Sequence, residues 1–335
     1  MASHHPIAVH GAGSWGTALA ILLAQNGHDV RLWGHKPEFL QQLEKDRCNS
    51  TYLPEIAFPP NLQICPDIKD SLQGSADLLM VVPSHAFRGQ LQICDGLLKP
   101  SSRLIIATKG LEQNSGKLLH QVGEEILGKD HPIAILSGPT FAREVASGLP
   151  TAVAIASNSS ETAANVAQLL HNKSLRAYTT NDVIGVQLGG ALKNVLAIAA
   201  GISDGLGLGA NSRAALITRG LAELIRLGTA LGGKQETFMG LAGVGDLILT
   251  CTDNQSRNRK LGMALGQGYS KDEAIASIGQ VVEGANTTKE MMKLAKKLQI
   301  ELPITEQVYR VLYENIAPQA AARALLGRER KPELG

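Results

Sequence analysis

The feature that most constrains the fold is a glycine-spaced turn near the start of the chain. Gly11, Gly13 and Gly16 follow a short apolar strand, Ile7–Val9, and precede a helical run over residues 17–25. Gly11 permits a tight turn, Gly13 lets the backbone approach a pyrophosphate, and Gly16 lets the helix pack closely on a sheet. The spacing therefore predicts a dinucleotide-binding loop, and its alternative is a glycine-rich turn of an unrelated α/β protein.

Short apolar segments alternate with helical patterns through the first half of the chain, which predicts a parallel sheet with helices on both faces. The expected strands are Ile7–Val9, Val30–Trp33, Leu78–Val82, Leu104–Ala107, Ile133–Leu136 and Ala152–Ala156. The proline-rich stretch 49–66 is interpreted as a loop excursion. Helix follows helix from about residue 181, apart from one possible strand, Leu247–Cys251. We expect an α/β, Rossmann-type dinucleotide-binding domain over 1–180 and an all-helical substrate and catalytic domain over 181–335.

Composition indicates which binding partners and which cellular compartment to expect. The formal charge of +2, from 32 basic and 30 acidic residues, gives no reason to expect nucleic acid or an acidic membrane as a partner. Four cysteines without a CxxC pair favour free thiols in a reducing compartment over a metal site. The first residues lack the pattern of a signal peptide, so a cytoplasmic location is expected. The oligomeric state stays open, and a homodimer is compatible with the sequence.

One segment, 183–202, is long and apolar enough to raise the question of a membrane span. Gln187, Lys193 and Asn194 interrupt it near the middle, which favours a buried helix of a globular domain. We therefore expect no integral membrane segment.

The end of the second expected strand bears on the choice of cofactor. An NAD-specific fingerprint places an acid there to hold the ribose 2′-hydroxyl. Here the strand ends at Trp33 and is followed by Gly34, His35 and Lys36, with no carboxylate before Glu38. A 2′-phosphate would be tolerated, so NADPH is the expected cofactor, with NADH as an additional one. The alternative is that His35 and Lys36 only begin a solvated helix.

Lys193 is the most informative residue of the second half, because it is the only formally charged side chain between Asp182 and Asp204. A lysine is rarely buried without a function. Gly189 and Gly190 lie one helical turn before it and would leave room for a ligand. A positioned ammonium can stabilise negative charge on a carbonyl oxygen that receives a hydride, and can supply the proton. The alternative is a lysine that snorkels to the surface.

Further candidates follow expected strands or begin expected helices. Lys109 lies after the strand 104–107, at the sheet edge where ligands bind in open parallel sheets. The segment 137–142 also follows a strand, and its proline suggests a helix start. The glycine-rich segment 240–246 is interpreted as a flexible approach to Asp246, whose carboxylate could orient the buried lysine. The segment 254–259 has the polar composition of a phosphate-binding helix start.

Taken together, these segments resemble the bacterial NAD(P)-dependent glycerol-3-phosphate dehydrogenases. The shared motifs are Gly-Ala-Gly-Ser-Trp-Gly-Thr-Ala-Leu at 11–19, Ala-Thr-Lys-Gly-Leu at 107–111, Ser-Gly-Pro-Thr-Phe-Ala at 137–142, Leu-Lys-Asn-Val at 192–195, Gly-Leu-Ala-Gly-Val-Gly-Asp-Leu at 240–247, Ser-Arg-Asn at 256–258 and Val-Glu-Gly at 282–284. The resemblance implies interconversion of dihydroxyacetone phosphate and sn-glycerol 3-phosphate for phospholipid synthesis. It also implies a helical domain similar to that of 6-phosphogluconate dehydrogenase, with the active site in the cleft between the domains.

The resemblance assigns roles position by position. It implies that the catalytic residues are Lys193, Lys109 and Asp246. It implies cofactor contacts from Gly11, Gly13, Ser14, Trp15, Gly16, His35, Lys109, Ala142, Arg257, Val281 and Glu283. It implies substrate contacts from Lys109, Gly138, Thr140, Lys193, Asp246, Ser256, Arg257 and Asn258. No metal is implied.

Two other classes remain open from the sequence. A β-hydroxyacid dehydrogenase would share the domain plan but would hold a carboxylate substrate without a phosphate cluster at 256–258. A dinucleotide sensor would bind NADPH without turnover, and it would have no need of Lys193 on a glycine-lined helix.

Overall fold

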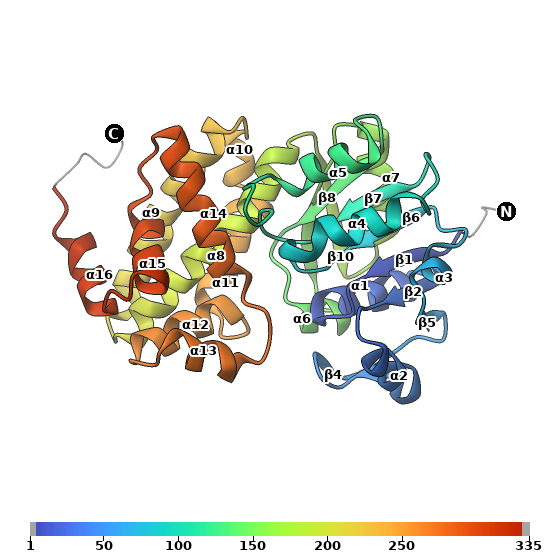
Figure 1. Ribbon diagram of the computed structural model, residues 1–335, viewed down its shortest axis with the longest axis horizontal. Coiled ribbons are helices and arrows are strands. Elements are labelled where there is room, and N and C mark those ends of the chain that lie inside the picture. The colour runs from blue at the N-terminus through green and yellow to red at the C-terminus, as the bar shows by residue number, and fades with distance from the viewer. Residues whose placement is uncertain (1–4, 330–335) are drawn as a thin grey trace.

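The computed structural model describes residues 5–329 and divides into a sheet-containing part and a helical part. Figure 1 shows the sheet with its helices at one end of the molecule and the bundle of later helices at the other. The sheet part ends with β10 and the helical part begins at Val183, the first residue of α8. This is the expected combination of a Rossmann-type fold and an all-helical domain.

Eight strands form one sheet in the order β10-β9-β8-β7-β6-β1-β2-β5. Their bounds are β1 Ile7–His10, β2 Val30–Trp33, β5 Leu62–Ile64, β6 Asp77–Met80, β7 Arg103–Ile106, β8 Ile133–Ser137, β9 Thr151–Ala156 and β10 Leu175–Thr180. Neighbours are parallel except β8 and β9, which are antiparallel. All six predicted strands are therefore present, but the sheet is mixed rather than wholly parallel.

Three strands were missed in the stretch predicted to be a loop. A two-stranded antiparallel ribbon, β3 (Cys48–Asn49) and β4 (Leu53–Ala57), lies there, and β5 joins the main sheet beside β2. The buried Asn49 side chain fastens this excursion to the glycine turn, donating to the carbonyl oxygen of Ala12 at 3.1 Å and to Thr17 Oγ1 at 2.8 Å. The excursion is thus a supporting element of the loop and not a loose insertion.

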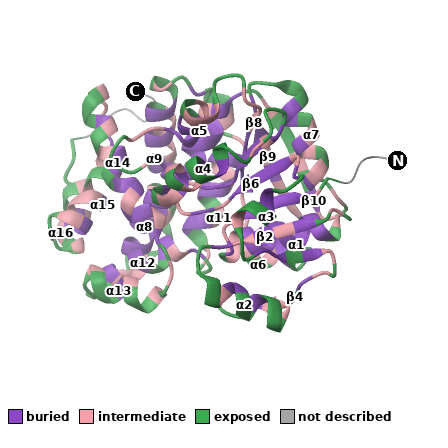
Figure 2. Ribbon diagram, turned by 45° about the vertical axis from the view of Figure 1, so that its right-hand side comes forward, coloured by how far each residue is buried: buried purple, intermediate pink, exposed green. Residues whose placement is uncertain are grey.

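Helices connect the strands along the chain and cover the sheet. Their bounds are α1 Ser14–Gln25, α2 Pro37–Asp46, α3 Ile68–Leu72, the 3₁₀ turn η1 Ser84–Ala86, α4 Phe87–Asp95, α5 Leu119–Leu127, α6 Ala142–Ala146 and α7 Ser160–Leu170. Pro139 lies three residues before α6, so the prediction that it begins a helix is wrong. Figure 2 shows central strands of the sheet such as β6 as buried, and β1 and β6 are buried along their whole length.

The helical part is built around α8 (Val183–Gly205), which is the candidate membrane span by length and composition. In its most apolar window 94% of the residues are buried inside the protein, as expected for a core helix. The elements around it are α9 Gly209–Ala230, α10 Gln235–Phe238, η2 Leu241–Gly245, α11 Asp246–Thr252, α12 Arg257–Gly266, α13 Lys271–Ile278, α14 Glu283–Leu298, α15 Pro303–Tyr313 and α16 Pro318–Leu326. The segment predicted as a possible strand is therefore the helix α11.

Glycines let the backbones of α8 and α12 approach each other closely. A Cβ atom added at Gly262 would lie 2.1 Å from the carbonyl oxygen of Ile198, and one added at Gly201 would lie 2.2 Å from that of Arg259. A real Cβ atom cannot lie so close to a backbone oxygen, so this contact requires glycine at both positions. This packing fixes α12, whose first turn carries the candidate phosphate cluster, against the helix that carries Lys193.

Gly262→Ala should lower the free energy of unfolding of the helical part by about 3 kcal/mol, since the added methyl meets backbone that cannot move aside. Gly89→Ala is the matched control, because Gly89 is exposed in α4 and an added Cβ there meets nothing within 4 Å. The control should be neutral or gain up to about 1 kcal/mol. Urea unfolding followed by circular dichroism measures both, and equal stability of the two variants would contradict the packing argument.

Candidate active site

The glycine turn occupies the edge of the sheet where the strands end. Gly11 has φ +121°, and its backbone lies so close to the next strand connection that an added Cβ would be 2.8 Å from the carbonyl of Val81. A Cβ at Gly16 would lie 1.9 Å from the Gly11 oxygen. Both glycines are therefore required by packing. Gly13 differs, since an added Cβ there meets nothing within 4 Å, which leaves one side of the turn open.

The first turn of α1 fits a dinucleotide pyrophosphate. Gly13 is the N-cap, no side chain caps the helix, and no acidic residue lies in its first turn. The amide groups of Ser14, Trp15 and Gly16 are therefore available to an anion, which the helix dipole also favours. The indole Nε1 of Trp15 is buried without a hydrogen-bond partner among the described residues. An unpaired buried donor is costly, and a ligand group at this place would satisfy it.

The order of the strands places this turn at a switch point of the sheet. β1 is followed on one side by β2 and on the other by β6, so the chain winds in opposite directions from it. Open α/β sheets bind ligands at the carboxyl ends of strands at such a point. His35 and Lys36 follow β2 and are exposed, and Lys36 is the N-cap of α2. Both remain available to a cofactor phosphate, although they also begin a solvated helix, as the alternative interpretation held.

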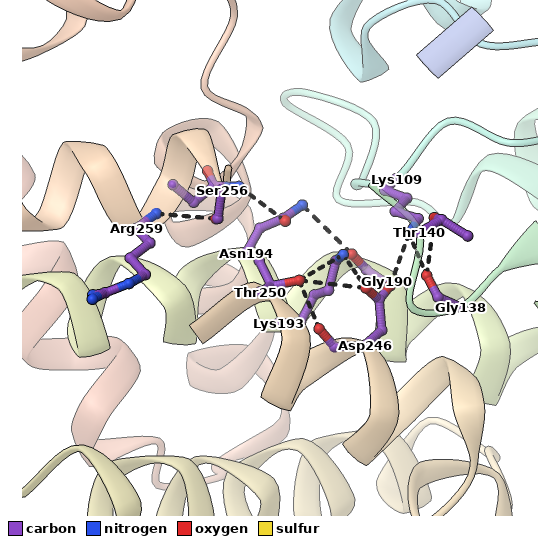
Figure 3. A network of polar contacts seen from close by, with 11 residues as sticks. Lys109, Gly138, Thr140, Gly190, Lys193, Asn194, Asp246, Thr250, Ser256 and Arg259 are labelled. Atoms are coloured by element: carbon purple, nitrogen blue, oxygen red, sulfur yellow. Dashed lines mark hydrogen bonds and ion pairs between the residues drawn. The ribbon is translucent and has the colours of Figure 1, made fainter. Parts of the chain in front are cut away.

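The buried residues Lys193 and Asp246 form one cluster with the partly buried Lys109 (Figure 3). The Asp246 carboxylate is fully buried; its Oδ1 accepts a hydrogen bond from Lys193 Nζ, and its Oδ2 accepts one from Lys109 Nζ at 2.8 Å. Lys109 also donates to the carbonyl oxygen of Gly138 at 3.0 Å. Because Lys109 follows β7 and the other two residues belong to α8 and α11, the cluster joins the sheet part to the helical part.

Lys193 does not snorkel to the surface, since its side chain is only 8% exposed. Burial lowers the pKa of Lys193 to about 7, the Asp246 carboxylate opposes that shift, and the nearby Lys109 ammonium adds to it. A lysine whose pKa lies near neutrality can both give and take a proton at physiological pH. The cluster therefore has the acid–base property that the sequence could only suggest.

Thr250 was missed by the sequence analysis and completes the cluster. Its hydroxyl donates to the backbone oxygen of Asp246 at 2.6 Å, and its oxygen accepts from Lys193 Nζ at 3.0 Å. The residue lies one helical turn after Asp246 on α11, so both face the lysine. The spacing of four residues would have been a usable signal only if the segment had been predicted as a helix.

The glycines before Lys193 serve close packing and do not line an open space. A Cβ at Gly189 would lie 2.2 Å from the oxygen of Ala242 in η2, and one at Gly190 would lie 2.6 Å from Ser137 Oγ at the end of β8. The segment leading to Asp246 has regular structure: η2 is a π-helical turn that runs directly into α11. The expectation of open room was wrong because the small residues hold the carboxylate close to α8.

The substrate segment after β8 is shaped by a left-handed glycine. Gly138 has φ +147°, and a Cβ there would lie 3.1 Å from the backbone of β9. Its carbonyl oxygen accepts from Lys109 and, at 3.1 Å, from Thr140 Oγ1. Ala142 is the first residue of α6 and packs on the core of the sheet part. The segment thus lies directly beside the lysine cluster.

The expected phosphate cluster begins α12. Ser256 is the N-cap, with its Oγ accepting from the amide of Arg259 at 3.2 Å. Asn258 donates to Asn194 Oδ1 at 2.9 Å and accepts from the amide of Gly284 at 2.9 Å. Asn194 was also missed, although a polar residue inside an apolar run is a signal. Arg259 points away from the cluster and pairs with Asp204 at 2.6 Å, so it is not a candidate ligand.

Arg257, Val281 and Glu283 meet at the start of α14. Arg257 Nη1 donates to the carbonyl oxygen of Val281 at 3.0 Å. Burial lowers the pKa of the Arg257 guanidinium, against the opposite influence of the Glu283 charge. Glu283 itself accepts two hydrogen bonds from Ser84, which belongs to the sheet part. Ser84 was not a candidate from the sequence.

The structure therefore joins the expected catalytic and substrate residues into hydrogen-bonded groups. The expected cofactor residues of the sheet part lie at the carboxyl edge of the sheet. The lysine cluster and the 138–140 segment are joined by hydrogen bonds, and Asn258 connects the phosphate cluster to α8 and α14. The glycine turn, His35 and Ala142 lie at the carboxyl ends of the strands. A dinucleotide-binding edge beside a buried lysine that can exchange a proton defines the class of NAD(P)-dependent dehydrogenases.

Comparisons with known proteins identify the family within that class. Residues 6–163 match the family described as NAD-dependent glycerol-3-phosphate dehydrogenase N-terminus, and residues 182–323 match the corresponding C-terminus family. The chain belongs to the NAD-dependent glycerol-3-phosphate dehydrogenase family.

Individual relatives are similar over almost the whole chain. A glycerol-3-phosphate dehydrogenase [NAD(P)+] of Serratia proteamaculans is 57% identical over 97% of this chain and 96% of its own. A glycerol-3-phosphate dehydrogenase [NAD(P)+] of a Shewanella species is 56% identical over 98% of this chain and 97% of its own. The crystal structure of the Coxiella burnetii glycerol-3-phosphate dehydrogenase superposes with a TM-score of 0.94 at 51% identity, covering 97% of this chain and 99% of that one. A D-mandelate dehydrogenase at 13% identity and TM-score 0.62 shares the fold alone.

Asp246→Asn should lower the free energy of unfolding at pH 6 by about 3 kcal/mol, because the buried Lys193 ammonium and the partly buried Lys109 ammonium lose their counter-charge. The loss should shrink at pH 9, where a deprotonated Lys193 needs no carboxylate. Urea unfolding at both pH values measures it. Asp272→Asn, at an exposed position of α13, is the matched control and should stay within about 0.5 kcal/mol of the parent protein. Equal stability of the two variants at pH 6 would contradict the burial argument.

Proposed function

We propose that this chain interconverts dihydroxyacetone phosphate and sn-glycerol 3-phosphate with NADPH or NADH. The observation that carries the proposal is the buried Lys193, whose pKa lies near 7 beside a dinucleotide-binding sheet edge. The relatives that carry the glycerol-3-phosphate dehydrogenase name cover nearly the whole chain at 56–57% identity. The product would serve as the backbone precursor of phospholipids.

The proposed binding of the dinucleotide uses the glycine turn and the residues around it. Gly11, Gly13, Ser14, Trp15 and Gly16 would hold the pyrophosphate at the start of α1. His35 would face the adenosine ribose, while Lys109, Ala142, Arg257, Val281 and Glu283 would contact the rest of the cofactor. When bound, the nicotinamide would supply or accept the hydride. The support is the uncapped helix start and the unpaired Trp15 donor described above.

The proposed substrate site lies between the lysine cluster and the start of α12. A phosphate would be held by Ser256, Arg257 and Asn258, where a helix N-terminus and a guanidinium favour an anion. Gly138 and Thr140 would contact the remainder, together with Lys109 and Asp246. A carboxylate substrate, as in a β-hydroxyacid dehydrogenase, would leave this phosphate cluster without a partner.

The proposed proton transfer is assigned to Lys193. A lysine ammonium has three donors, and protein groups engage two of them here: the Asp246 carboxylate and the Thr250 hydroxyl. The third would donate to the substrate oxygen during reduction and would be restored from solvent after release. Lys109 also has two engaged donors, on Asp246 and Gly138, and its third would help to hold the carbonyl oxygen. Asp246 would keep both ammonium groups aimed at one point.

Two further expectations accompany this function. We propose that residues 1–180 and 181–335 act as the cofactor domain and the catalytic domain; their outermost residues lie outside the described range 5–329. We also propose a cytoplasmic location, supported by four free cysteines, three of them buried. The homodimer stays a prediction, which sedimentation velocity would test.

Lys193→Ala should lower kcat for ketone reduction at least about 100-fold, because the reaction loses its positioned proton donor. NADPH binding should stay nearly intact. In the parent protein, kcat for reduction should fall as pH rises through about 7, since the ammonium is the acid, and kcat for oxidation should rise over the same range. The variant should lose both dependences. Unchanged turnover would remove Lys193 from the mechanism.

The protein should oxidise NADPH with dihydroxyacetone phosphate at least as efficiently as NADH, because no carboxylate lies at the end of β2 to repel a 2′-phosphate. Lys36→Glu should lower kcat/KM for NADPH by about fivefold more than for NADH. Lys45→Glu, in the last turn of α2, is the matched control. Nicotinamide absorbance measures all of these rates.

Three results would overturn the cofactor and substrate assignments separately. A large preference for NADH would refute the cofactor prediction. Turnover of a 2-methyl-3-hydroxy acid in place of dihydroxyacetone phosphate would move the chain to the β-hydroxyacid class, and tight NADPH binding without turnover of any phosphorylated ketone would favour a sensor.

A further inference from the structure

The contact between Ser84 and Glu283 also joins the two parts of the chain, apart from the lysine cluster. Ser84 Oγ donates to Glu283 Oε2 at 2.7 Å, and the Ser84 amide donates to Glu283 Oε1 at 3.2 Å. Both carboxylate oxygens are thus held by one residue that lies 199 positions away in the sequence. A hydrogen bond to a charged acceptor is stronger than a neutral one, so the pair fixes the direction of the carboxylate.

The position of Ser84 is itself fixed by the sheet. It begins η1 directly after Pro83, in the connection that leaves the carboxyl end of β6. Thr108 Oγ1, which follows the neighbouring strand β7, donates to the carbonyl oxygen of Val82 at 2.7 Å and so anchors this connection. Because β6 lies beside β1 at the switch point, Ser84 stands at the edge where a dinucleotide binds.

The space around the pair is kept free by a glycine next to Lys109. Gly110 has φ +150°, and a Cβ added there would lie 3.0 Å from Ser84 Cβ and 3.3 Å from Glu283 Oε2. Three segments therefore converge: the end of β6, the residue after Lys109, and the first residue of α14. Such a convergence places a carboxylate from the helical part against the cofactor edge of the sheet.

Glu283 is also tied to the substrate side of the site. The amide of its neighbour Gly284 donates to Asn258 Oδ1 at 2.9 Å, and Asn258 in turn donates to Asn194 Oδ1, beside Lys193. The start of α14 thus has fixed contacts with α12 and α8 on one side and with Ser84 on the other. Removal of the Ser84 hydroxyl would leave the backbone amide as the only hydrogen-bond donor from that residue to the carboxylate.

We infer that Ser84 is a positioning residue that orients the Glu283 carboxylate for the bound dinucleotide. The inference rests on the proposed function, in which Glu283 contacts the cofactor. An ionised carboxylate has about four lone-pair sites, so the two bonds from Ser84 leave sites for donors of the cofactor. Ser84 acts through Glu283 and takes no part in the proton transfer at Lys193.

Equilibrium dialysis of the full-length protein with NADPH alone tests this inference without turnover. Ser84→Ala should raise Kd for NADPH by about five- to tenfold, since one charge-assisted hydrogen bond is lost. Steady-state assays should show a similar rise of KM for NADPH with a change of kcat below about twofold. Ser102→Ala, a buried serine at the opposite end of the sheet, is the matched control and should leave Kd unchanged.

A double-mutant cycle with Glu283→Gln separates positioning from a general structural effect. If Ser84 acts through the carboxylate, the Ser84 substitution should change Kd by less than about twofold when it is made in the Glu283→Gln variant. Thermal unfolding without cofactor verifies that each variant folds. Additive effects of the two substitutions, or an unchanged Kd in the Ser84 variant, would overturn the inference.

The same cycle distinguishes this inference from the proposed function. If Glu283→Gln leaves Kd unchanged, Glu283 does not contact the cofactor, and both the contact and the role of Ser84 are refuted. If Glu283→Gln weakens NADPH binding and Ser84→Ala does not, only the role of Ser84 is refuted. Neither result depends on dihydroxyacetone phosphate being the substrate, because no substrate is added.

Discussion

One buried carboxylate, Asp246, shared between two lysines, is the interaction on which the rest of the structure depends. Burial of an ion pair is costly, and it is tolerated only where hydrogen bonds satisfy the groups that lose water. Here the carboxylate accepts hydrogen bonds from Lys193, which belongs to the same helical part, and from Lys109, which belongs to the sheet part. The same contact therefore joins the two parts and opposes the fall in the Lys193 pKa that burial causes, so that folding and acid–base chemistry both involve one carboxylate.

Close backbone packing makes this arrangement possible. Gly189 lets the π-helical turn before Asp246 approach α8, and Gly262 lets α12 approach the same helix. α8 is consequently surrounded at short distance, and Lys193 has little access to water. The low exposure that shifts the pKa of Lys193 is thus a product of glycine positions in two elements, α8 and α12. Ser84 and Glu283 add a further connection between the parts at the cofactor edge.

Local patterns in the sequence predicted the Rossmann-type sheet, the change to helices near residue 180 and the importance of Lys193, because each leaves a signal within a few neighbouring residues. The pairing of Lys109 with Asp246 could not be predicted, since it is a long-range contact between the two parts of the chain. The segment 247–251 was mistaken for a strand because a short apolar run does not distinguish a strand from a buried helix. That error concealed Thr250, whose spacing from Asp246 is meaningful only on a helix. Glycines expected to give room, Gly189 and Gly190, instead serve close packing, which periodicity cannot reveal.

The most direct test is an NMR titration of the protein labelled with ¹³C at lysine side chains, with the Lys193 signal assigned by its absence from a Lys193→Ala spectrum. This one Cε resonance should titrate with a pKa near 7. A Lys193 resonance that titrates at the free-lysine value of about 10.4 would contradict a buried ammonium that exchanges a proton near neutral pH.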